Sequence, residues 1–192
     1  KTKSALFSSL PNDGFAFINY DDKYISTFTT NARQVTYSFT SEADFYGEYA
    51  NGSLDLNNFE ISIPCTSQIM AQNILAIFSI AHSLGIIPED IATSVNTFEL
   101  PKGRGKILNH NGITIIDDTY NANLESAKAG INTLAQYFGK RKIAIMGDMF
   151  ELGEMAIEHH RELGEFISIS KIDVLFATGE LSQLTVNAAE NV

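Results

Sequence analysis

Cysteine and tryptophan are the residues that this 192-residue sequence most lacks, with one cysteine and no tryptophan. A single cysteine excludes an intramolecular disulfide, a zinc site made of cysteines and an iron–sulfur cluster. We interpret Cys65 as a small buried hydrophobic residue, a common state of a free cysteine. A chain without disulfides fits a reducing compartment, and we therefore expect a cytoplasmic protein.

Positive charge is also scarce. The sequence has 13 Lys and Arg against 23 Asp and Glu, which gives a formal net charge of −10. Such an acidic chain has no general attraction for nucleic acid or for anionic membranes, which leaves only a local cationic site for phosphate. The longest apolar run, near Ile74–Ala81, is far shorter than the about 18 residues of a membrane span, and no signal-peptide pattern opens the sequence.

The length and the composition are those of a globular protein. Hydrophobic residues make up 44% and charged residues 19%, and 192 residues suit one large domain or two small ones. The sequence starts without Met, and Leu181–Val192 is predicted to be a helix cut short by the end of the chain. We therefore expect a fragment of a larger protein.

Residues 1–100 mix the two periodicities of regular structure. Strands are predicted at Phe15–Asn19, Gln34–Phe39, Phe45–Ala50 and Phe59–Ile63, the last two as a hairpin or meander. Helices are predicted at Ser4–Leu10, Lys23–Thr30 and Thr66–Leu84, and from Pro88 onward. The helix that starts at Pro88 is expected to bury Ile91, Val95 and Phe98 on one face.

A short cationic segment, Leu100–Lys106, changes the pattern, and we place a flexible domain boundary there, between residues 1–100 and 101–192. Beyond it, strands alternate with helices. The strands are predicted at Ile113–Asp117, Lys142–Met146 and Val174–Ala177, and the helices at Ser126–Phe138 and Met155–Ile169. The fold class is therefore α/β, with a parallel sheet and right-handed crossovers in the second domain.

Polar strings follow all three strands of the second domain, where open parallel sheets bind their ligands. They are Asp117–Asn123, Gly147–Glu154 and Thr178–Glu180. Asp118 or Asn123 is also suited to cap a helix, but one cap needs one such residue and the first string offers four. We interpret Glu151 and Glu154 as solvated acids at a helix start. The strings predict a site for hydroxyls, amines or amides.

Several common sites are excluded by what the motifs lack. No G-x-G-x-x-G follows the first strand, and no G-x-x-x-x-G-K-[ST] loop is present, so neither a Rossmann dinucleotide site nor a complete triphosphate cradle is predicted. His159 and His160 are adjacent on a predicted helix and point about 100° apart, which makes a poor metal pair. We interpret both as surface histidines.

Two strings, Ile116–Asn123 and Ile145–Glu154, resemble the Mur ligases. The Tyr-Asn-Ala-Asn and Gly-Asp-Met-x-Glu-Leu-Gly motifs in them look like the member that adds D-Ala-D-Ala to a UDP-N-acetylmuramoyl-tripeptide. Further matches are Lys3–Phe7, Asn19–Asp22, Asn73–Ile77 and Gly103-Arg104. The resemblance covers nearly the whole chain, but not the family's phosphate-binding loop or the end of its last domain. It implies that residues 1–100 are the later part of a central ATPase domain, and residues 101–192 an incomplete Rossmann-like C-terminal domain.

The resemblance implies roles for individual residues in ATP-dependent amide-bond formation through an acyl phosphate. Lys3 would be carbamylated and would ligate Mg²⁺, because a carbamate offers hard anionic oxygens. Asn73 would contact the adenine, Asp118 the ribose hydroxyls and Arg104 the γ-phosphate, for which its forked guanidinium is suited.

The same resemblance places Tyr120, Asn121 and Asn123 near the incoming D-Ala-D-Ala. The implied partners are this dipeptide, ATP and the UDP-linked tripeptide, with no nucleic acid, no membrane and no obligate protein partner. Without the phosphate-binding loop, the fragment alone is expected to be inactive.

Two alternatives stay open. One is a non-catalytic module that binds a nucleotide or a cell-wall peptide through the same fold. The other is a sibling amide ligase with another acceptor, including the folate-polyglutamate type, against which the Tyr120–Asn123 string argues. A nicotinamide oxidoreductase is remote because its glycine fingerprint is lacking.

Overall fold

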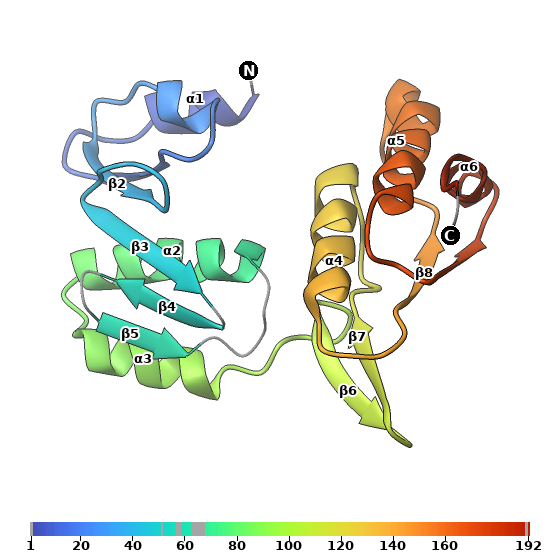
Figure 1. Ribbon diagram of the computed structural model, residues 1–192. Coiled ribbons are helices and arrows are strands. Elements are labelled where there is room, and N and C mark those ends of the chain that lie inside the picture. The colour runs from blue at the N-terminus through green and yellow to red at the C-terminus, as the bar shows by residue number, and fades with distance from the viewer. Residues whose placement is uncertain (1, 51, 57–58, 63–67, 191) are drawn as a thin grey trace. The chain divides into compact units, whose positions relative to one another are not determined.

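The chain forms two compact units, residues 1–98 and 99–192 (Figure 1). The structure is a computed structural model that describes residues 2–50, 52–56, 59–62, 68–190 and 192, without the side chains of residues 2 and 3. Cys65 lies outside the described residues, and so does the start of the helix predicted from Thr66. The division between the units falls two residues before the boundary that we place after residue 100.

The first unit contains a five-stranded sheet in the order β1-β2-β3-β4-β5. The strands are β1 Phe15–Asn19, β2 Arg33–Ser38, β3 Phe45–Ala50, β4 Ser53–Leu56 and β5 Phe59–Ser62. The pairs β1–β2 and β2–β3 are parallel, whereas β3–β4 and β4–β5 are antiparallel. The predicted meander is confirmed, but it contains β4, where the sequence analysis predicts no strand.

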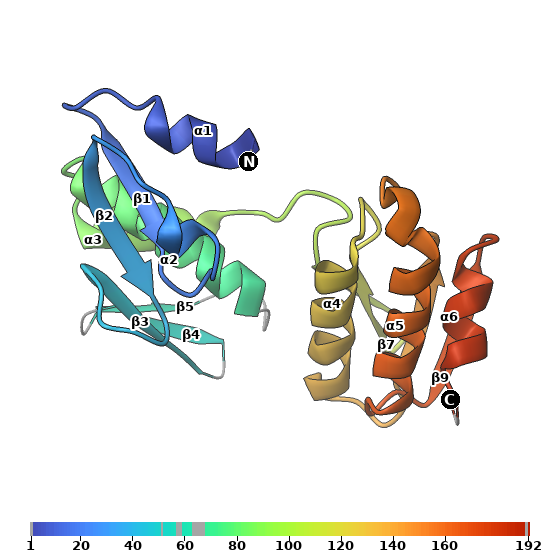
Figure 2. The same ribbon diagram turned by 90° about the horizontal axis from the view of Figure 1, so that it is seen from above.

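Helices α2 Gln68–Ser83 and α3 Pro88–Thr97 pack against this sheet (Figure 2). The face of α2 that contacts the strands includes Ile74 and Leu75, which are almost fully buried. In α3, burial of Ile91 and Val95 is confirmed. Burial of Phe98 is wrong: the helix ends at Thr97, so Phe98 leaves the helical face and is 54% exposed.

Two short helices complete the first unit. Helix α1 covers Thr2–Ser8, close to the predicted Ser4–Leu10. The helix predicted at Lys23–Thr30 is only a single 3₁₀ turn, η1 Ile25–Thr27. The Asp22 side chain accepts hydrogen bonds from the backbone N–H of Tyr24 and of Ile25, both at 2.8 Å. Such local capping satisfies the donors of one turn and favours a turn over a longer helix.

The second unit contains two pairs of strands and three helices. Strands β6 Lys106–His110 and β7 Ile113–Asp117 form an antiparallel hairpin, and β8 Ile143–Gly147 pairs in parallel with β9 Val174–Thr178. The helices are α4 Leu124–Gln136, α5 Ala156–Ser168, preceded by the 3₁₀ turn η2 Gly153–Met155, and α6 Ser182–Ala188. The last helix is shorter than the predicted Leu181–Val192.

The β6–β7 hairpin differs from the parallel sheet that the sequence analysis predicts for the second domain. The parallel pairing of β8 with β9 is confirmed, but β7 has β6 as its hydrogen-bonded partner, in a two-stranded antiparallel sheet. Asn111 and Gly112 join the two strands with φ of 49° and 77°. An Asn-Gly pair with positive φ at both positions is a strong hairpin signal, which the sequence analysis missed.

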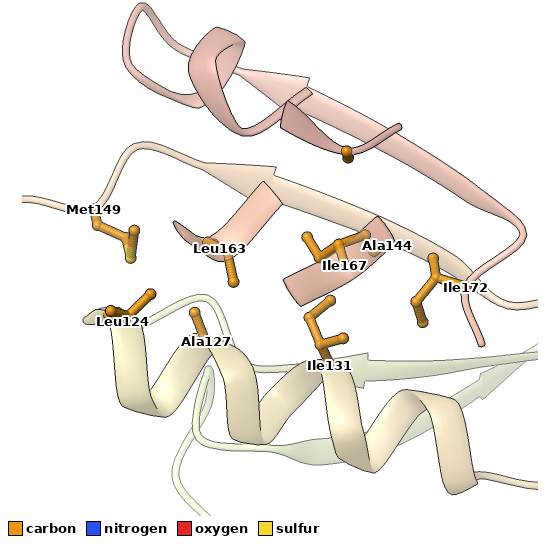
Figure 3. Packing of buried hydrophobic residues seen from close by; sticks show 9 residues of the cluster. Leu124, Ala127, Ile131, Ala144, Met149, Leu163, Ile167 and Ile172 are labelled. Carbon is orange, nitrogen blue, oxygen red and sulfur yellow. The ribbon is translucent and has the colours of Figure 1, made fainter. Parts of the chain in front are cut away.

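The core of the second unit lies between its helices and the β8–β9 pair (Figure 3). Helix α4 contributes Leu124, Ala127 and Ile131, and α5 contributes Leu163 and Ile167. Helix α4 therefore turns an apolar face toward the core over its first turns. The helix predicted to run to Phe138 is shorter at its end: α4 ends at Gln136, and Phe138 is 99% exposed.

Helices α5 and α6 approach each other closely at Gly164, which is buried. A Cβ atom built on Gly164 would lie 2.7 Å from the Cβ of Ala188 and would also clash with the carbonyl oxygen of Thr185. Real Cβ atoms essentially never come so close, and the backbone oxygen has no freedom to move aside. The contact therefore depends on glycine.

Replacing Gly164 with Ala should destabilise the second unit by about 1–3 kcal/mol, because the added methyl group forces α5 and α6 apart. Urea unfolding followed by far-UV circular dichroism measures the change. Gly139→Ala is the matched control, since a Cβ at Gly139 meets no atom within 4 Å. Equal stability of the two variants would contradict the packing described here.

Candidate functional site

The Asp117 carboxylate, at the end of β7, joins two segments that are far apart in the sequence. Its Oδ1 accepts a hydrogen bond from Thr119 Oγ1 at 2.7 Å, and its Oδ2 accepts one from the backbone N–H of Gly103 at 3.2 Å. The hydrogen bond from Thr119 is the main cause that lowers the pKa of Asp117, and burial opposes it. The ionised carboxylate is thus the form that holds the two segments together.

Backbone hydrogen bonds strengthen the same junction. Gly105 N–H donates to the Asp117 carbonyl at 2.8 Å, and Tyr120 N–H donates to the Gly103 carbonyl at 3.0 Å. Gly103 has φ of +75°, and a Cβ there would lie 2.9 Å from the Tyr120 nitrogen. The segment that we expected to be a flexible linker is therefore fixed at Gly103–Gly105, which is a correction to the sequence analysis.

This junction brings together three of the predicted site residues. The Arg104 guanidinium lies over the Tyr120 ring, 3.9 Å from its centroid, in a cation–π contact. Desolvation raises the pKa of the neighbouring Asp118 carboxyl, and the charge of Arg104 acts in the opposite direction. Arg104, Asp118 and Tyr120 are all on the surface. Together they present a cation, an aromatic ring and a carboxyl group to solvent, a combination suited to a phosphorylated ligand with hydroxyl groups.

The two asparagines of the first polar string lie beyond this cluster. Asn123 is the N-cap of α4: its Oδ1 accepts from Ser126 N–H, and its own N–H donates to Ser126 Oγ, both at 2.9 Å. The capping interpretation is thus confirmed for Asn123, whereas Asp118 lies outside the cap. The Asn121 side chain is exposed, and its Oδ1 accepts from Ala122 N–H at 2.9 Å.

A second carboxylate ties together the loops after β8 and β9. Asp148 Oδ1 accepts from the N–H and the Oγ of Ser182, at 2.7 and 2.6 Å, and its Oδ2 accepts from Glu180 N–H at 3.1 Å. The hydrogen bonds from Ser182 are the leading cause that lowers the pKa of Asp148. Gly179 has a φ of +119°, and the Asp148 carboxylate occupies the place where a Cβ atom of residue 179 would lie.

The residues that follow Asp148 and Met149 face solvent. Phe150 is 70% exposed, and Glu151 has φ of +61° although it is not glycine. Such a backbone conformation is uncommon for residues other than glycine and asparagine. Glu151 and Glu154 are exposed, as expected of solvated acids, but the 3₁₀ turn η2 begins only at Gly153.

The burial of His160 differs most from the sequence analysis. We expected a surface histidine, but the residue is fully buried in α5. Its Nε2 lies 3.0 Å from the backbone nitrogen of Met149, and its Nδ1 lies 2.6 Å from the carbonyl oxygen of Ala156. The spacing of His160 from Leu163, Gly164 and Ile167 matches the buried face of a helix, and it is the signal that could have found it.

The remaining predicted residues belong to the first unit. Asn73 is exposed on α2, so it is not a packed core asparagine. The backbone of Lys3 lies in α1, but its side chain is outside the described part of the structure. In the described ranges, no three His, Cys, Asp or Glu side chains come together as metal ligands, and none of the helices is long and apolar enough to cross a membrane.

Comparison with known proteins extends over both units. The Mur ligase middle domain matches residues 1–81, and the glutamate ligase domain of the Mur ligases matches residues 103–192. A UDP-N-acetylmuramoyl-tripeptide–D-alanyl-D-alanine ligase of Synechocystis is 28% identical over 180 residues, which are 92% of this chain and 39% of that protein. The chain thus spans about two fifths of the length of this relative.

Solved structures agree on the fold. MurF from Acinetobacter baumannii superposes with a TM-score of 0.87 at 24% identity, over 98% of this chain and 44% of that one. MurF from Thermotoga maritima in complex with ADP superposes with a TM-score of 0.78 at 23% identity, over 96% of this chain and 45% of that one. The predicted α/β fold class, with Mur ligase middle and C-terminal domains, is confirmed.

The lowered pKa of Asp148 predicts a pH-dependent contribution to stability. Because the folded pKa lies below the ordinary value of 3.8, the stabilisation is present above that value and is lost as pH falls through the folded pKa. Asp148→Asn should lower the free energy of unfolding near neutral pH, and its deficit relative to the wild type should shrink in acid.

Urea unfolding at about pH 7 and about pH 3 measures this difference. Glu165→Gln, at an exposed position of α5, is the matched control and should show little change at either pH. A deficit of Asp148→Asn that is independent of pH would contradict the assigned role of the carboxylate.

Proposed function

This chain belongs to the Mur ligase family, and on that basis we propose that the full-length protein containing it is an ATP-dependent amide ligase. We assign to it the addition of D-Ala-D-Ala to UDP-N-acetylmuramoyl-tripeptide in peptidoglycan precursor synthesis. The observation that carries this proposal is the cluster of Arg104, Asp118 and Tyr120, which the Asp117 junction assembles. The name of the Synechocystis relative supports the same pair of substrates.

The proposed reaction has two steps. An oxygen of the tripeptide carboxylate attacks the γ-phosphorus of ATP, the bond to the bridging oxygen breaks, and ADP leaves with the bonding electrons. The amine of D-Ala-D-Ala then attacks the carbonyl carbon of the acyl phosphate and loses a proton. Phosphate departs, and the amide remains. Positioning and neutralisation of the phosphate charge account for most of the catalysis in such transfers.

Arg104 is assigned to the γ-phosphate. The guanidinium lies over the Tyr120 ring and carries N–H donors at its edge. Those donors match the spacing of phosphate oxygens and bind them in pairs. The contact with the ring also limits the conformations of the side chain, so less entropy is lost when phosphate binds.

The other contacts follow from the family resemblance. Asp118 is assigned to the ribose hydroxyls, and Asn73, on α2 of the first unit, to the adenine. Tyr120, Asn121 and Asn123 are assigned to D-Ala-D-Ala. Since the Oδ1 of Asn123 is engaged in the cap of α4, its contact with the dipeptide would use Nδ2. The second-unit residues of this set all belong to the polar segment after β7.

Magnesium is proposed as the metal of the reaction, with carbamylated Lys3 as a ligand. The residues described in the structure do not by themselves form a metal site, and no step above is routed through the metal. A cytoplasmic location is proposed because a chain with a single cysteine fits a reducing compartment. The 192-residue chain alone is expected not to catalyse the reaction.

In the full-length protein, Arg104→Lys should lower kcat by roughly 10²–10³-fold, because the lysine retains the charge but loses the paired donors. The assay follows ADP formation that depends on both UDP-N-acetylmuramoyl-tripeptide and D-Ala-D-Ala. Arg141→Lys, at an exposed position just before β8, is the control and should keep wild-type activity.

A screen of acceptor amines tests the substrate assignment. Ligation of glutamate or diaminopimelate in place of D-Ala-D-Ala would point to a sibling amide ligase. Binding of ATP without ADP formation for any acceptor would point to a non-catalytic binding module. Either result would overturn the assignment of D-Ala-D-Ala.

A further inference from the structure

We infer that His160 is a positioning residue that fixes the loop after β8, residues 148–152, at the edge of the sheet where ligands bind. The inference deepens the proposed function, on which its catalytic part rests. Open α/β sheets bind ligands beyond the carboxyl ends of their strands, and this loop follows the carboxyl end of β8. The Gly-Asp-Met string in it has no role in the reaction as described so far.

The hydrogen bonds of His160 define one tautomer. The backbone N–H of Met149 has only a proton to give, so Nε2 must accept it with its lone pair. The carbonyl oxygen of Ala156 has only lone pairs, so Nδ1 must carry the proton of the ring and donate it. Both contacts are satisfied only by the neutral Nδ1–H form. Full burial of the ring makes an unpaired nitrogen costly.

Two neighbouring residues of the loop are thereby anchored in different ways. Met149 is held through its backbone by His160, and its side chain is 1% exposed in the core. Asp148 is held through its side chain by Ser182. Helix α6 also contacts His160 directly, because Thr185 Oγ1 donates to the His160 carbonyl at 3.0 Å. The base of the loop is therefore tied to both α5 and α6.

The next two residues are free to face a ligand. Phe150 is 70% exposed, and Glu151 adopts the left-handed conformation. Strained backbone of this kind persists only when its surroundings fix it, and the hydrogen bond from Met149 N–H to His160 lies two residues before Glu151 along the chain. A packed leucine would fill the same volume as the imidazole but would leave that N–H without an acceptor. The acceptor, rather than the bulk, is what positions the loop.

Nitrogen NMR of the wild-type chain tests the tautomer without any substitution. Imidazole signals of His160 should show a protonated Nδ1 and an unprotonated Nε2. A protonated Nε2 would overturn the inference, because that nitrogen could not accept the Met149 N–H.

Two variants separate the acceptor from the bulk. In His160→Leu, hydrogen exchange of the Met149 amide should be roughly tenfold faster or more. In His160→Gln, the side-chain carbonyl offers an acceptor, so amide protection should be largely restored. His110→Gln, at an exposed position of β6, is the control and should leave the Met149 amide unchanged. Equal protection in the leucine variant and the wild type would overturn the inference.

Kinetics of the full-length protein test the link to catalysis. We expect His160→Leu to lower kcat/KM for ligation about tenfold or more, and His160→Gln to recover most of it, at equal ATP concentration. If His160→Leu and His160→Gln have the same kcat/KM, the acceptor at residue 160 has no role in positioning for the reaction. If the wild type shows no ligation, the proposed function fails, whereas the tautomer and exchange results still decide whether His160 holds the loop.

Discussion

The arrangement of the second unit depends on the ionised carboxylate of Asp117. It is the acceptor that Gly103 N–H and Thr119 Oγ1 share, and it holds the segment before β6 against the segment after β7. Without that junction, Arg104 would belong to a mobile connection between two units. With it, the guanidinium lies over the Tyr120 ring, at a defined place beside Asp118.

The same device occurs a second time in this unit. Asp148 follows β8 as Asp117 ends β7, and each carboxylate accepts hydrogen bonds from one hydroxyl group and from a backbone N–H of another segment. Each of the two carboxylates thus has a structural role. Residues shortly after them face solvent: Tyr120 in one loop and Phe150 in the other. Two polar strings that look alike as ligand sites therefore combine anchoring side chains with exposed ones.

Local sequence patterns predict much of this fold. The bounds of β1, β3 and β7 agree residue for residue with the prediction, because runs of apolar and aromatic residues bounded by turn signals specify a strand locally. Strand β4 escapes prediction because it has only 4 residues, and its pairing with β3 and β5 defines it more than its composition does. Strand β6 is as long as β7, and its local signal was the Asn111-Gly112 turn, which the sequence analysis did not use. The burial of His160 could have been predicted from its helical spacing, but its hydrogen bond with Met149 could not. That bond and the close approach of Gly103 to Tyr120 are tertiary contacts, which no local pattern encodes.

Transfer of oxygen from the substrate to phosphate tests the proposed ligase reaction most directly. The full-length protein would be given UDP-N-acetylmuramoyl-tripeptide labelled with ¹⁸O in its terminal carboxylate, together with ATP and D-Ala-D-Ala. Attack of that carboxylate on the γ-phosphorus predicts that one ¹⁸O atom appears in each phosphate released during ligation. Unlabelled phosphate accompanied by amide formation would contradict the acyl phosphate, and with it the assignment of Arg104 to the transferred group.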